Sequence, residues 1–258
     1  MLGTLTIGTT NLTTAYRVYV TDAPIYNAPE PDVTSISIMG RSGDLFVDNK
    51  RYKNITVEYP CVIPAASGNQ ASFASCIAGL RAFLLSNRGY VKIANSFDTS
   101  EYRMGRYVGG LEVDPTVTGD AATFKLVFDC QPQRWLVSGD TPITLTRTSS
   151  GQSSFGSITN PTLYEALPII TVTGSGSGNV MVTSPSDESI YVSISSMTGS
   201  LTMDSQLQDA YYDGTNLNDK ITLAQNMFLK LFPGVTRFNV TTSFNVSRLV
   251  VTPRWWTV

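Results

Sequence analysis

Along much of the chain, apolar and polar residues alternate with a period of two, which is the pattern of strands that bury one face. The three clearest runs are "NITVEYPCVI", "TFKLVFDC" and "SIYVSIS". Their apolar faces consist of Ile55, Val57, Tyr59, Cys61 and Ile63, then Phe124, Leu126, Phe128 and Cys130, then Ile190, Val192 and Ile194. Further short strands are predicted at 16–20, 91–94, 167–174 and 201–203. The pattern therefore predicts a mainly β protein.

One stretch has the period of a helix instead. In "NQASFASCIAGLRAFLLSNRG" apolar residues recur at spacings of three and four, which places them along one side of a helix. This stripe consists of Phe73, Ile77, Leu80 and Leu84. Ser67 or Asn69 is expected to cap the start, and Gly89 to follow the end. The sequence predicts one helix, at about 70–87, in the first half of the chain.

The chain is long enough for two domains, with 258 residues. A stretch rich in Ser, Thr and Gly, "VSGDTPITLTRTSSGQSSFGS", lies between the two halves, and "ITLT" inside it resembles a short strand. We expect an N-terminal β domain with the helix over 1–137, a linker region over 138–157 and a small C-terminal β-sandwich over 158–258.

The composition excludes several classes of function. Charged residues make up 15% of the chain, against roughly 25% in an average globular domain. The formal net charge is −2, so no electrostatic grip on nucleic acid or on an anionic membrane is indicated. The chain has no histidine, which removes Ser-His-Asp triads, Cys-His dyads and histidine metal ligands. We therefore expect no catalytic activity, no cofactor and no metal.

The sequence shows neither a membrane span nor a signal peptide, and its cysteines do not suggest disulfide bonds. No run of 18 apolar residues is present, and "MLGTLTIGTT" lacks the charged start of a signal peptide. The three cysteines, Cys61, Cys76 and Cys130, are an odd number and lie on or beside apolar faces, so we expect buried, reduced thiols. Synthesis in the cytoplasm is the expectation that follows.

Two polar motifs resemble ligand sites but have simpler explanations. "GSGSGN" (174–179) resembles a phosphate loop, yet an apolar strand follows it where a helix would be needed, so we expect a hairpin connection. Four acidic residues, Asp204, Asp209, Asp213 and Asp219, do not have the alternate spacing of a calcium loop. Capping of turns between strands is their expected role.

Two other segments are candidates for contacts. The basic run "NKRYK" contains Lys50, Arg51 and Lys53, which we expect in a solvated turn or a subunit contact. The chain closes on "RLVVTPRWWTV", which uses two of its three tryptophans. Because chain ends usually fray, we expect Arg254, Trp255 and Trp256 to anchor this end, with the two tryptophans on opposite sides of a terminal strand.

The second half resembles the C-terminal half of the distal tail proteins (Dit) of long-tailed (siphovirus) bacteriophages that infect Gram-positive bacteria. The resemblance lies in the order of three segments, "LQDAYYDGTNLNDKI", "FLKLFPGVTRFNV" and "RLVVTPRWWTV". The matching residues are Asp209, Tyr211, Asn216, Phe232, Pro233, Gly234, Pro253, Arg254, Trp255 and Trp256.

The first half is similar to the same family. "SISIMGRSGDLFVDNKRYKNITVEYPC" resembles the family's hairpin around a Gly-Arg-x-Gly turn, here Gly40, Arg41 and Gly43. The single helix, "YRMGRYVGGLEV" and a strand that ends in Cys-x-Pro, here Cys130 and Pro132, follow in order. The resemblance thus covers nearly the whole chain.

The resemblance implies a structural role in the virion. It implies an N-terminal β-sandwich with one α-helix and a hairpin arm, followed by a C-terminal galectin-like β-sandwich. Such proteins form a hexameric ring at the tail tip, which joins the tail tube protein to the tail-associated hub (lysin) protein. The ring surrounds a channel through which DNA leaves without specific binding, and some relatives dock receptor-binding proteins on the outer domains.

Two functions of other classes stay open at the level of sequence. A galectin-like sandwich with exposed aromatic residues would suit a carbohydrate-binding (lectin-like) adhesion module. A carboxylate-dependent glycoside hydrolase would need two facing acids at a defined separation, which the order of residues does not reveal.

Overall fold

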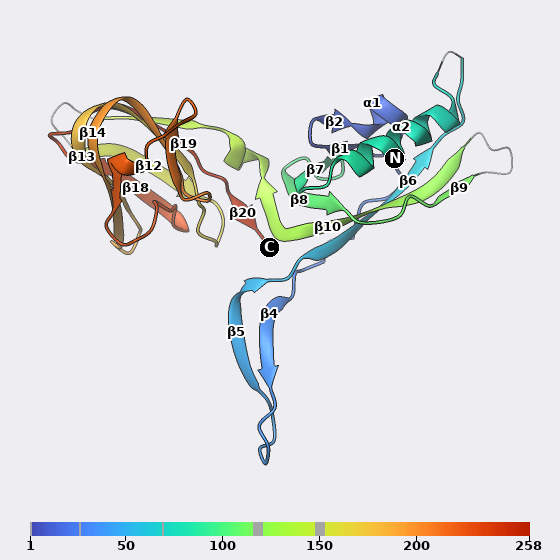
Figure 1. Ribbon diagram of the computed structural model, residues 1–258, viewed down its shortest axis with the longest axis horizontal. Helices are drawn as coiled ribbons and strands as arrows, with labels where there is room; N and C mark the ends of the chain where they lie inside the picture. Colours follow the sequence, from blue (N-terminus) through green and yellow to red (C-terminus); the bar gives the residue numbers. More distant parts are fainter. Residues whose placement is uncertain (1, 26, 69, 116–120, 148–152) are drawn as a thin grey trace. The chain divides into compact units, whose positions relative to one another are not determined.

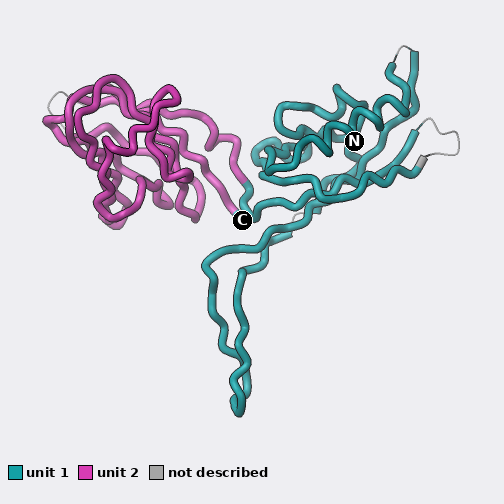
Figure 2. The backbone as a smooth tube through the Cα atoms, in the orientation of Figure 1, with its two compact units in different colours: residues 1–134, 258 teal, residues 135–257 magenta. Residues whose placement is uncertain are grey.

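The computed structural model describes residues 2–25, 27–68, 70–115, 121–147 and 153–258. The chain divides into two compact units: unit 1 holds residues 1–134 and 258, and unit 2 holds residues 135–257 (Figure 2). Both are built mainly from antiparallel strands, so the mainly β prediction is confirmed. In the described part of the chain, no helix is both long enough and apolar enough to cross a membrane.

The described part of unit 1 contains two helices and most of the strands shown in blue to green in Figure 1. Its elements are β1 (Leu5–Ile7), β2 (Thr10–Asn11), α1 (Leu12–Tyr16), β3 (Tyr19–Val20), β4 (Pro31–Ile36), β5 (Leu45–Tyr52), β6 (Ile55–Ile63), α2 (Phe73–Ser86), β7 (Val91–Asn95), β8 (Glu101–Tyr107), β9 (Val113–Pro115) and β10 (Ala122–Leu136), whose last two residues belong to unit 2.

The main sheet of unit 1 curls until its two ends nearly meet. Its strands follow the order β2-β1-β7-β8-β10-β6-β3, and β9 also pairs with β10. Just before β1, Gly3 forms a bridge with Val20 of β3, with backbone hydrogen bonds of 2.7 and 2.9 Å. A Cβ atom on Gly3 would lie 2.4 Å from the Phe97 ring, so a larger residue at this closure would have to displace that ring.

The core of unit 1 fills the inside of this curled sheet, and α2 covers it. The predicted faces of β6 and β10 are both buried, since every apolar residue named for them from sequence is at most 7% exposed. On α2, Ile77, Leu80 and Leu84 are buried and Phe73 is partly buried. The predicted stripe therefore does face the core. The helix is capped by Ser72, whose Oγ accepts from the Ser75 N–H, rather than by Ser67; Asn69 lies outside the described residues.

The predicted strand at 16–20 is wrong for its first half. Residues 12–16 form the short helix α1, which the sequence did not predict. The Asn11 side chain accepts from the N–H groups of Thr13 and Thr14 and so caps this helix. Arg17 then ends it in a left-handed conformation, with φ of 57°, and only Tyr19–Val20 remain extended.

Unit 2 is a β-sandwich (Figure 1). Its elements are η1 (Val137–Asp140), β11 (Ile143–Thr146), β12 (Ser154–Asn160), β13 (Ile169–Thr183), β14 (Ser189–Asp204), β15 (Asp209–Tyr212), β16 (Thr215–Asn216), η2 (Asn218–Lys220), β17 (Ile221–Leu223), β18 (Gly234–Val240), β19 (Asn245–Thr252) and β20 (Trp256–Thr257). The stretch expected as a linker region, 138–157, thus includes β11 and the start of β12.

The long strands β13 and β14 run through both layers of the sandwich. The first part of β13 pairs with β19, and its last part, Val180–Thr183, pairs with β18. In the same way β14 pairs with β17 near its start and with β15 at its end. One layer is therefore β11-β19-β13-β14-β15-β16, and the other contains β12, β18 and β17 around the same central pair.

The segment "GSGSGN" lies inside β13, so the predicted hairpin connection there is wrong. The register between β13 and β14 shifts between Gly176 and Gly178, which marks a bulge at the bend between the two layers. A Cβ atom on Gly174 would meet the Asn245 oxygen at 2.2 Å, and one on Gly178 would meet the Phe244 Cβ at 2.5 Å. The glycines are needed because the chain just before and at the start of β19 passes this close, not because a phosphate binds.

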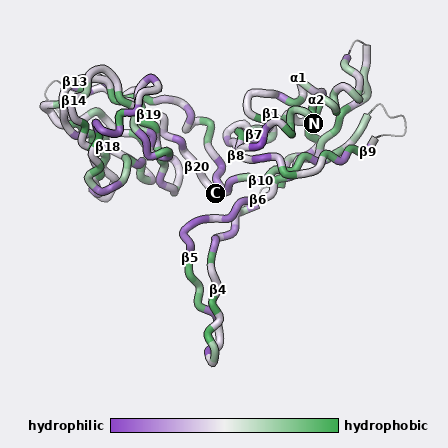
Figure 3. Tube along the Cα trace, viewed as in Figure 1, coloured by the Kyte–Doolittle hydropathy of each residue, from purple (hydrophilic) through white to green (hydrophobic). Residues whose placement is uncertain are grey.

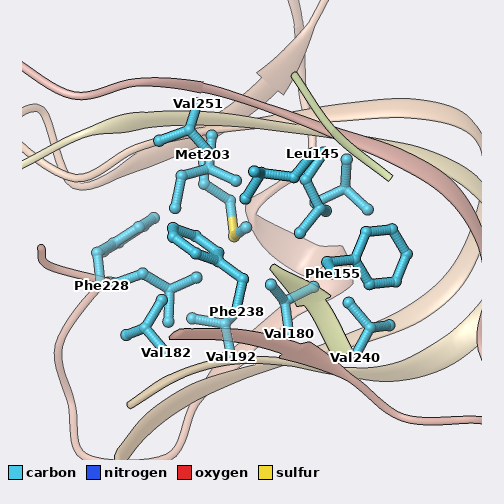
Figure 4. Packing of buried hydrophobic residues seen from close by; sticks show 14 of the residues in the cluster. Leu145, Phe155, Val180, Val182, Val192, Met203, Phe228, Phe238, Val240 and Val251 are labelled. Carbon is cyan, nitrogen blue, oxygen red and sulfur yellow. The ribbon is translucent and has the colours of Figure 1, made fainter. Parts of the chain in front are cut away.

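The core of unit 2 forms between the two layers. Phe238 and Val182 from neighbouring strands pack with Val192, Met203 and Phe228 (Figure 4). The predicted inner face of "SIYVSIS" is buried here, with Ile190, Val192 and Ile194 at most 2% exposed. Each unit therefore has its own hydrophobic core.

All three cysteines are free and buried inside unit 1. Cys61 and Cys130 lie on the inner faces of β6 and β10, and Cys76 lies on the inner side of α2. Burial raises the pKa of Cys61 to about 12 and that of Cys130 to about 11. Since the thiolate is the reactive form, both side chains are protected by position and by protonation.

We expect a thiol reagent at pH 8 to react with the native protein at least about tenfold more slowly than with a free cysteine, because little thiolate is present or accessible. After denaturation the same reagent should titrate three thiols. A fast-reacting native thiol, or a disulfide found by mass spectrometry after alkylation, would contradict this expectation.

Candidate functional site

The hairpin of β4 and β5 is an arm that pairs only with itself in the described part of the chain. Figure 1 shows the two strands side by side. Every residue of β5 is exposed, and so are all but one of β4. Its exposed apolar side chains are Val33, Ile36, Ile38, Met39, Leu45, Phe46 and Val47, of which Phe46 is 68% exposed and Met39 fully exposed. Figure 3 shows hydrophobic stretches along both strands of this arm. A lone two-stranded hairpin is marginally stable in water, so this arm has the properties of a segment that another surface covers.

The tip of the arm is preorganised by polar contacts. Gly40 and Gly43 adopt φ values of 78° and 87°, which favour glycine, around the turn that contains Arg41. The carboxylate of Asp44 accepts hydrogen bonds from the hydroxyls of Ser35 and Ser37 across the hairpin. These bonds hold the pKa of Asp44 below its usual value, so they persist at neutral pH.

The basic run lies at the base of the arm. Arg51 pairs with Asp32 on β4, and its hydrogen bond lowers the pKa of that carboxyl group. Lys53 pairs with Glu30 at 3.3 Å, and both residues lie just outside the paired strands β4 and β5. Lys50 is exposed and adopts a φ of 54°, and its backbone N–H donates to Asp48. Two of the three cations predicted as a subunit contact therefore hold the two strands of the arm together.

A groove runs along the outer face of β6 and β10 in unit 1. It consists of two hollows of about 720 and 550 Å³ that share Pro60 and Lys125. Ile25, which is 78% exposed, lines the second hollow. Glu58, which pairs with Lys125 at 2.9 Å, also lies in its wall.

Arg254 closes unit 2 through a sharp turn. Its φ is 59°, and its backbone N–H donates to the Gly139 oxygen at 2.9 Å. Its guanidinium makes two parallel hydrogen bonds, of 2.7 and 2.8 Å, to the carboxylate of Asp204, whose side chain is 1% exposed. Burial by itself raises the pKa of Asp204, but the bonds from Arg254 and from the Leu207 N–H outweigh it, so the pKa lies below its ordinary value.

The two tryptophans that follow have different surroundings. Trp255 is 4% exposed and belongs to the core of unit 2. A Cβ atom on Gly139 would lie 2.3 Å from the Trp255 nitrogen, so the turn of η1 packs directly on this segment. Trp256 is partly exposed; its ring stacks on Tyr164 at 4.4 Å, and its Nε1 donates to the Glu165 oxygen. The stack covers one face of the Trp256 ring, and the hydrogen bond to Glu165 uses the only donor of this side chain.

The four acidic residues of the 204–219 segment do not meet at one point. Asp204 binds Arg254, whereas Asp209 accepts from the amides of Asn216 and Asn218. Asp219 pairs with Lys220, and Asp213 occupies a turn with a φ of 47°. Among the described residues, no group of three or more potential ligands could hold a metal ion. The role of Asp204 as the partner of Arg254 was missed because 50 residues separate the two and no local pattern links them.

The chain is thus a mainly β protein with two units, and unit 1 carries an arm that no other described strand covers. The candidate sites on this protein are surfaces for contact with other proteins. The fold is similar to that of the SPP1 Dit protein (gp 19.1), a protein described as a paradigm of the hub adsorption apparatus in phages that infect Gram-positive bacteria. The two structures align over 100% of both chains with a TM-score of 0.71 and 17% identity. The resemblance drawn from the sequence is thus confirmed at the level of the fold.

Two structures of the phage p2 baseplate in its activated conformation are also similar. One contains calcium; it aligns over 97% of this chain and 98% of that chain, with a TM-score of 0.54 and 12% identity. The other contains strontium and aligns over 97% of each chain, with a TM-score of 0.50 and 10% identity. No protein-family model and no curated protein matches the sequence. At such low identities the similarity establishes the fold alone.

Proposed function

We propose that this protein is a structural component of a phage tail tip or baseplate and has no catalytic role. The observation that carries the proposal is the full-length match to the fold of SPP1 Dit, including both units. The uncovered apolar arm supports it, because exposed apolar surfaces of this kind mark sites where another protein binds. The low share of charged residues, 15%, suits extended protein contacts.

The proposed assembly is a closed ring of six copies, in which the arm of one copy docks on unit 1 of the next. Contacts between different surfaces of identical chains produce rings when the rotation closes. The groove along β6 and β10 offers the exposed side chain of Ile25 and the partly buried Pro60 to such an arm. In the virion the ring would join the tail tube protein to the hub protein and surround a channel for DNA. Unit 2 would project as the galectin-like domain that docks receptor-binding proteins.

A neutral unit 1 is compatible with a DNA channel. Residues 1–135 contain 12 basic and 12 acidic side chains, so this part of the chain has no excess of cations. Phosphate contacts with an excess of Lys and Arg would hold DNA by counterion release. A channel through which DNA must pass quickly is better lined by surfaces without an excess of Lys and Arg.

A carbohydrate-binding role for the terminal tryptophans is less well supported. The Trp256 ring is stacked on Tyr164, and Trp255 is buried in the core of unit 2. A lectin platform needs an aromatic face that is open to the sugar ring. The observed contacts favour an anchor at this end of the chain.

We expect the triple substitution Met39→Ser, Leu45→Ser and Phe46→Ser to abolish ring formation while both units stay folded, because it removes the apolar surface of the arm and no core residue. Light scattering and particle images of the full chain, alone and mixed with tube and hub proteins, measure the assembly. Leu163→Ser is the matched control, since Leu163 is 90% exposed but lies in unit 2. A wild-type chain that stays monomeric in every mixture would overturn the proposed ring, and a triple variant that still forms rings would overturn the role of the arm.

A further inference from the structure

The arm is joined to the sheet of unit 1 by two segments, 22–29 and 54–59, that do not pair with each other. The last backbone hydrogen bond at the base of the arm runs from the Lys53 N–H to the Glu30 oxygen at 2.9 Å. The next one reaches the Pro60 oxygen from the residue before 22–29, also at 2.9 Å. Between these two bonds, no backbone hydrogen bond joins the described residues of the two segments. Residues of both segments line hollows of about 550 and 520 Å³ instead.

This arrangement gives the arm a pivot at its base. The segment 54–59 is fixed from Ile55 onward, because β6 pairs with β10 along its whole length. The segment 22–29 is an unpaired tether in its described part. Only Lys53 and Asn54 connect the end of β5 to the start of β6. A few residues that join two elements are where a hinge absorbs a change of angle, so the arm is hinged at this connection.

A row of polar side chains holds the connection. The Asn54 amide donates to the Tyr90 hydroxyl at 2.6 Å and to Oδ2 of Asp129 at 3.1 Å. The same Oδ2 atom accepts from Nε of Arg106 at 2.9 Å. Asn54 lies just before β6 and Tyr90 just before β7, while Arg106 belongs to β8 and Asp129 to β10. These four strands are neighbours in the sheet, so the row ties the base of the arm to one end of it.

We propose that Asn54 is a positioning residue, which holds the arm at one angle to the sheet through its bonds to Tyr90 and Asp129. The bonds are exposed, so they contribute little to the stability of unit 1 as a whole. The angle of the arm needs only a small free energy to fix, because no backbone pairing across the hinge competes with the side chains. Arg106 keeps the Asp129 carboxylate in place for Asn54.

The purpose of this device rests on the proposed function, in which the arm docks on the next copy. A segment that is held in its binding position loses less conformational freedom when it binds. An arm at a fixed angle should therefore assemble at lower protein concentration than an arm that swings about its base.

The distance between two spin labels measures the angle of the arm. One label is placed at Val47→Cys on β5 and the other at Ala82→Cys on α2, since both positions are exposed and the three natural cysteines are buried. The labelled full chain is diluted with unlabelled chain, so that only distances within one chain are measured. We expect one narrow distribution for the labelled chain, and one about twofold wider after Asn54→Ala or Tyr90→Phe, because each change removes hydrogen bonds of the row.

Controls separate positioning from a general loss of structure. Asn245→Ala is the matched change, because it removes an exposed amide that bonds Ser175 in unit 2, and it should leave the distribution narrow. Asn54→Ala and Tyr90→Phe should hardly change Tm. A wide distribution without either substitution, or a narrow one with both, would overturn the proposal. A fall in Tm of many degrees in both variants would also overturn it, since the row would then stabilise the unit as a whole.

Light scattering keeps this inference apart from the proposed ring. Asn54→Ala should raise the concentration needed for assembly about threefold, with rings still formed at higher concentration. If the unsubstituted chain forms no ring in any mixture, the proposed ring fails, whereas the label distances still decide the role of Asn54. Equal assembly of the two chains, despite a wider distribution in the variant, would contradict the link between the angle of the arm and docking.

Discussion

Replacing Trp255 with alanine should destabilise unit 2 by about 3–5 kcal/mol, because the substitution removes a fully packed aromatic ring and leaves a cavity. The ring is 4% exposed and lies in the core cluster together with Val251 and Leu249 of β19. The main chain on either side is held by the Arg254 N–H to Gly139 bond and by the Leu136 N–H to Trp255 bond. The segment therefore has little freedom to move into the space that the ring leaves.

Trp256→Ala is the matched control at the next position. Its ring is partly exposed and stacks on Tyr164, so its loss should cost about 0.5–1.5 kcal/mol beyond the area it buries. Because the chain has two units, a single melting curve does not separate them. Hydrogen exchange followed by mass spectrometry, on peptides from β13 and β14, measures the opening of unit 2 alone.

The opposite pattern would contradict the anchoring role. If both variants showed wild-type protection and only binding to a glycan array fell, the tryptophans would form a ligand platform. If Trp256→Ala were the more harmful of the two, the packing described for Trp255 would not be what stabilises this end of the chain.

Asp204→Ala should cost about 3–5 kcal/mol, since it leaves the Arg254 guanidinium without its buried partner. The Asp204 side chain is 1% exposed, and that of Arg254 is 20% exposed. The same carboxylate also accepts from the N–H groups of Gln206 and Leu207 at 3.0 and 3.1 Å, so the turn after β14 loses its cap. Asp204→Asn is the control that keeps an acceptor for the turn but removes the charge, and it should be less harmful.

The ion pair also predicts how stability depends on pH. The folded-state pKa of Asp204 lies below the ordinary value of an aspartic acid. Its contribution is therefore fully present above about pH 4 and is lost as the pH falls through the lower, folded-state pKa. Wild-type unit 2 should lose this part of its stability below pH 4, whereas Asp204→Asn should lack it at every pH. Hydrogen exchange of the same peptides between pH 2.5 and pH 6 provides the comparison, after correction for the intrinsic exchange rate, and parallel profiles for the two proteins would contradict the assignment.

The sequence was informative where a single face of an element decides the structure. The alternation in β6, in β10 and at the start of β14 identified the buried residues, and the stripe on α2 identified its inner side, because burial of one face leaves a period in the chain. The pattern did not predict α1, since five residues are too few to show a helical period and the deciding contact is the cap from Asn11.

Features that depend on distant residues were beyond the reach of local patterns. The glycines at 174–178 looked like a turn because the close approach of Phe244 and Asn245 comes from another strand. Similarly, the acidic segment gave no sign that Asp204 alone would bind Arg254. For the basic run, the acidic partners Asp32 and Glu30 lie about 20 residues earlier, on the opposite strand of the arm.

The first and last segments of unit 2 lie side by side. Leu136, near its start, donates its backbone N–H to the oxygen of Trp255, near its end, at 2.9 Å, and residue 258 belongs to unit 1 again. The two ends of unit 2 therefore lie next to each other. A unit with adjacent ends tolerates circular permutation, so new termini placed in an exposed loop of unit 2, with its old ends joined, should leave its sandwich folded.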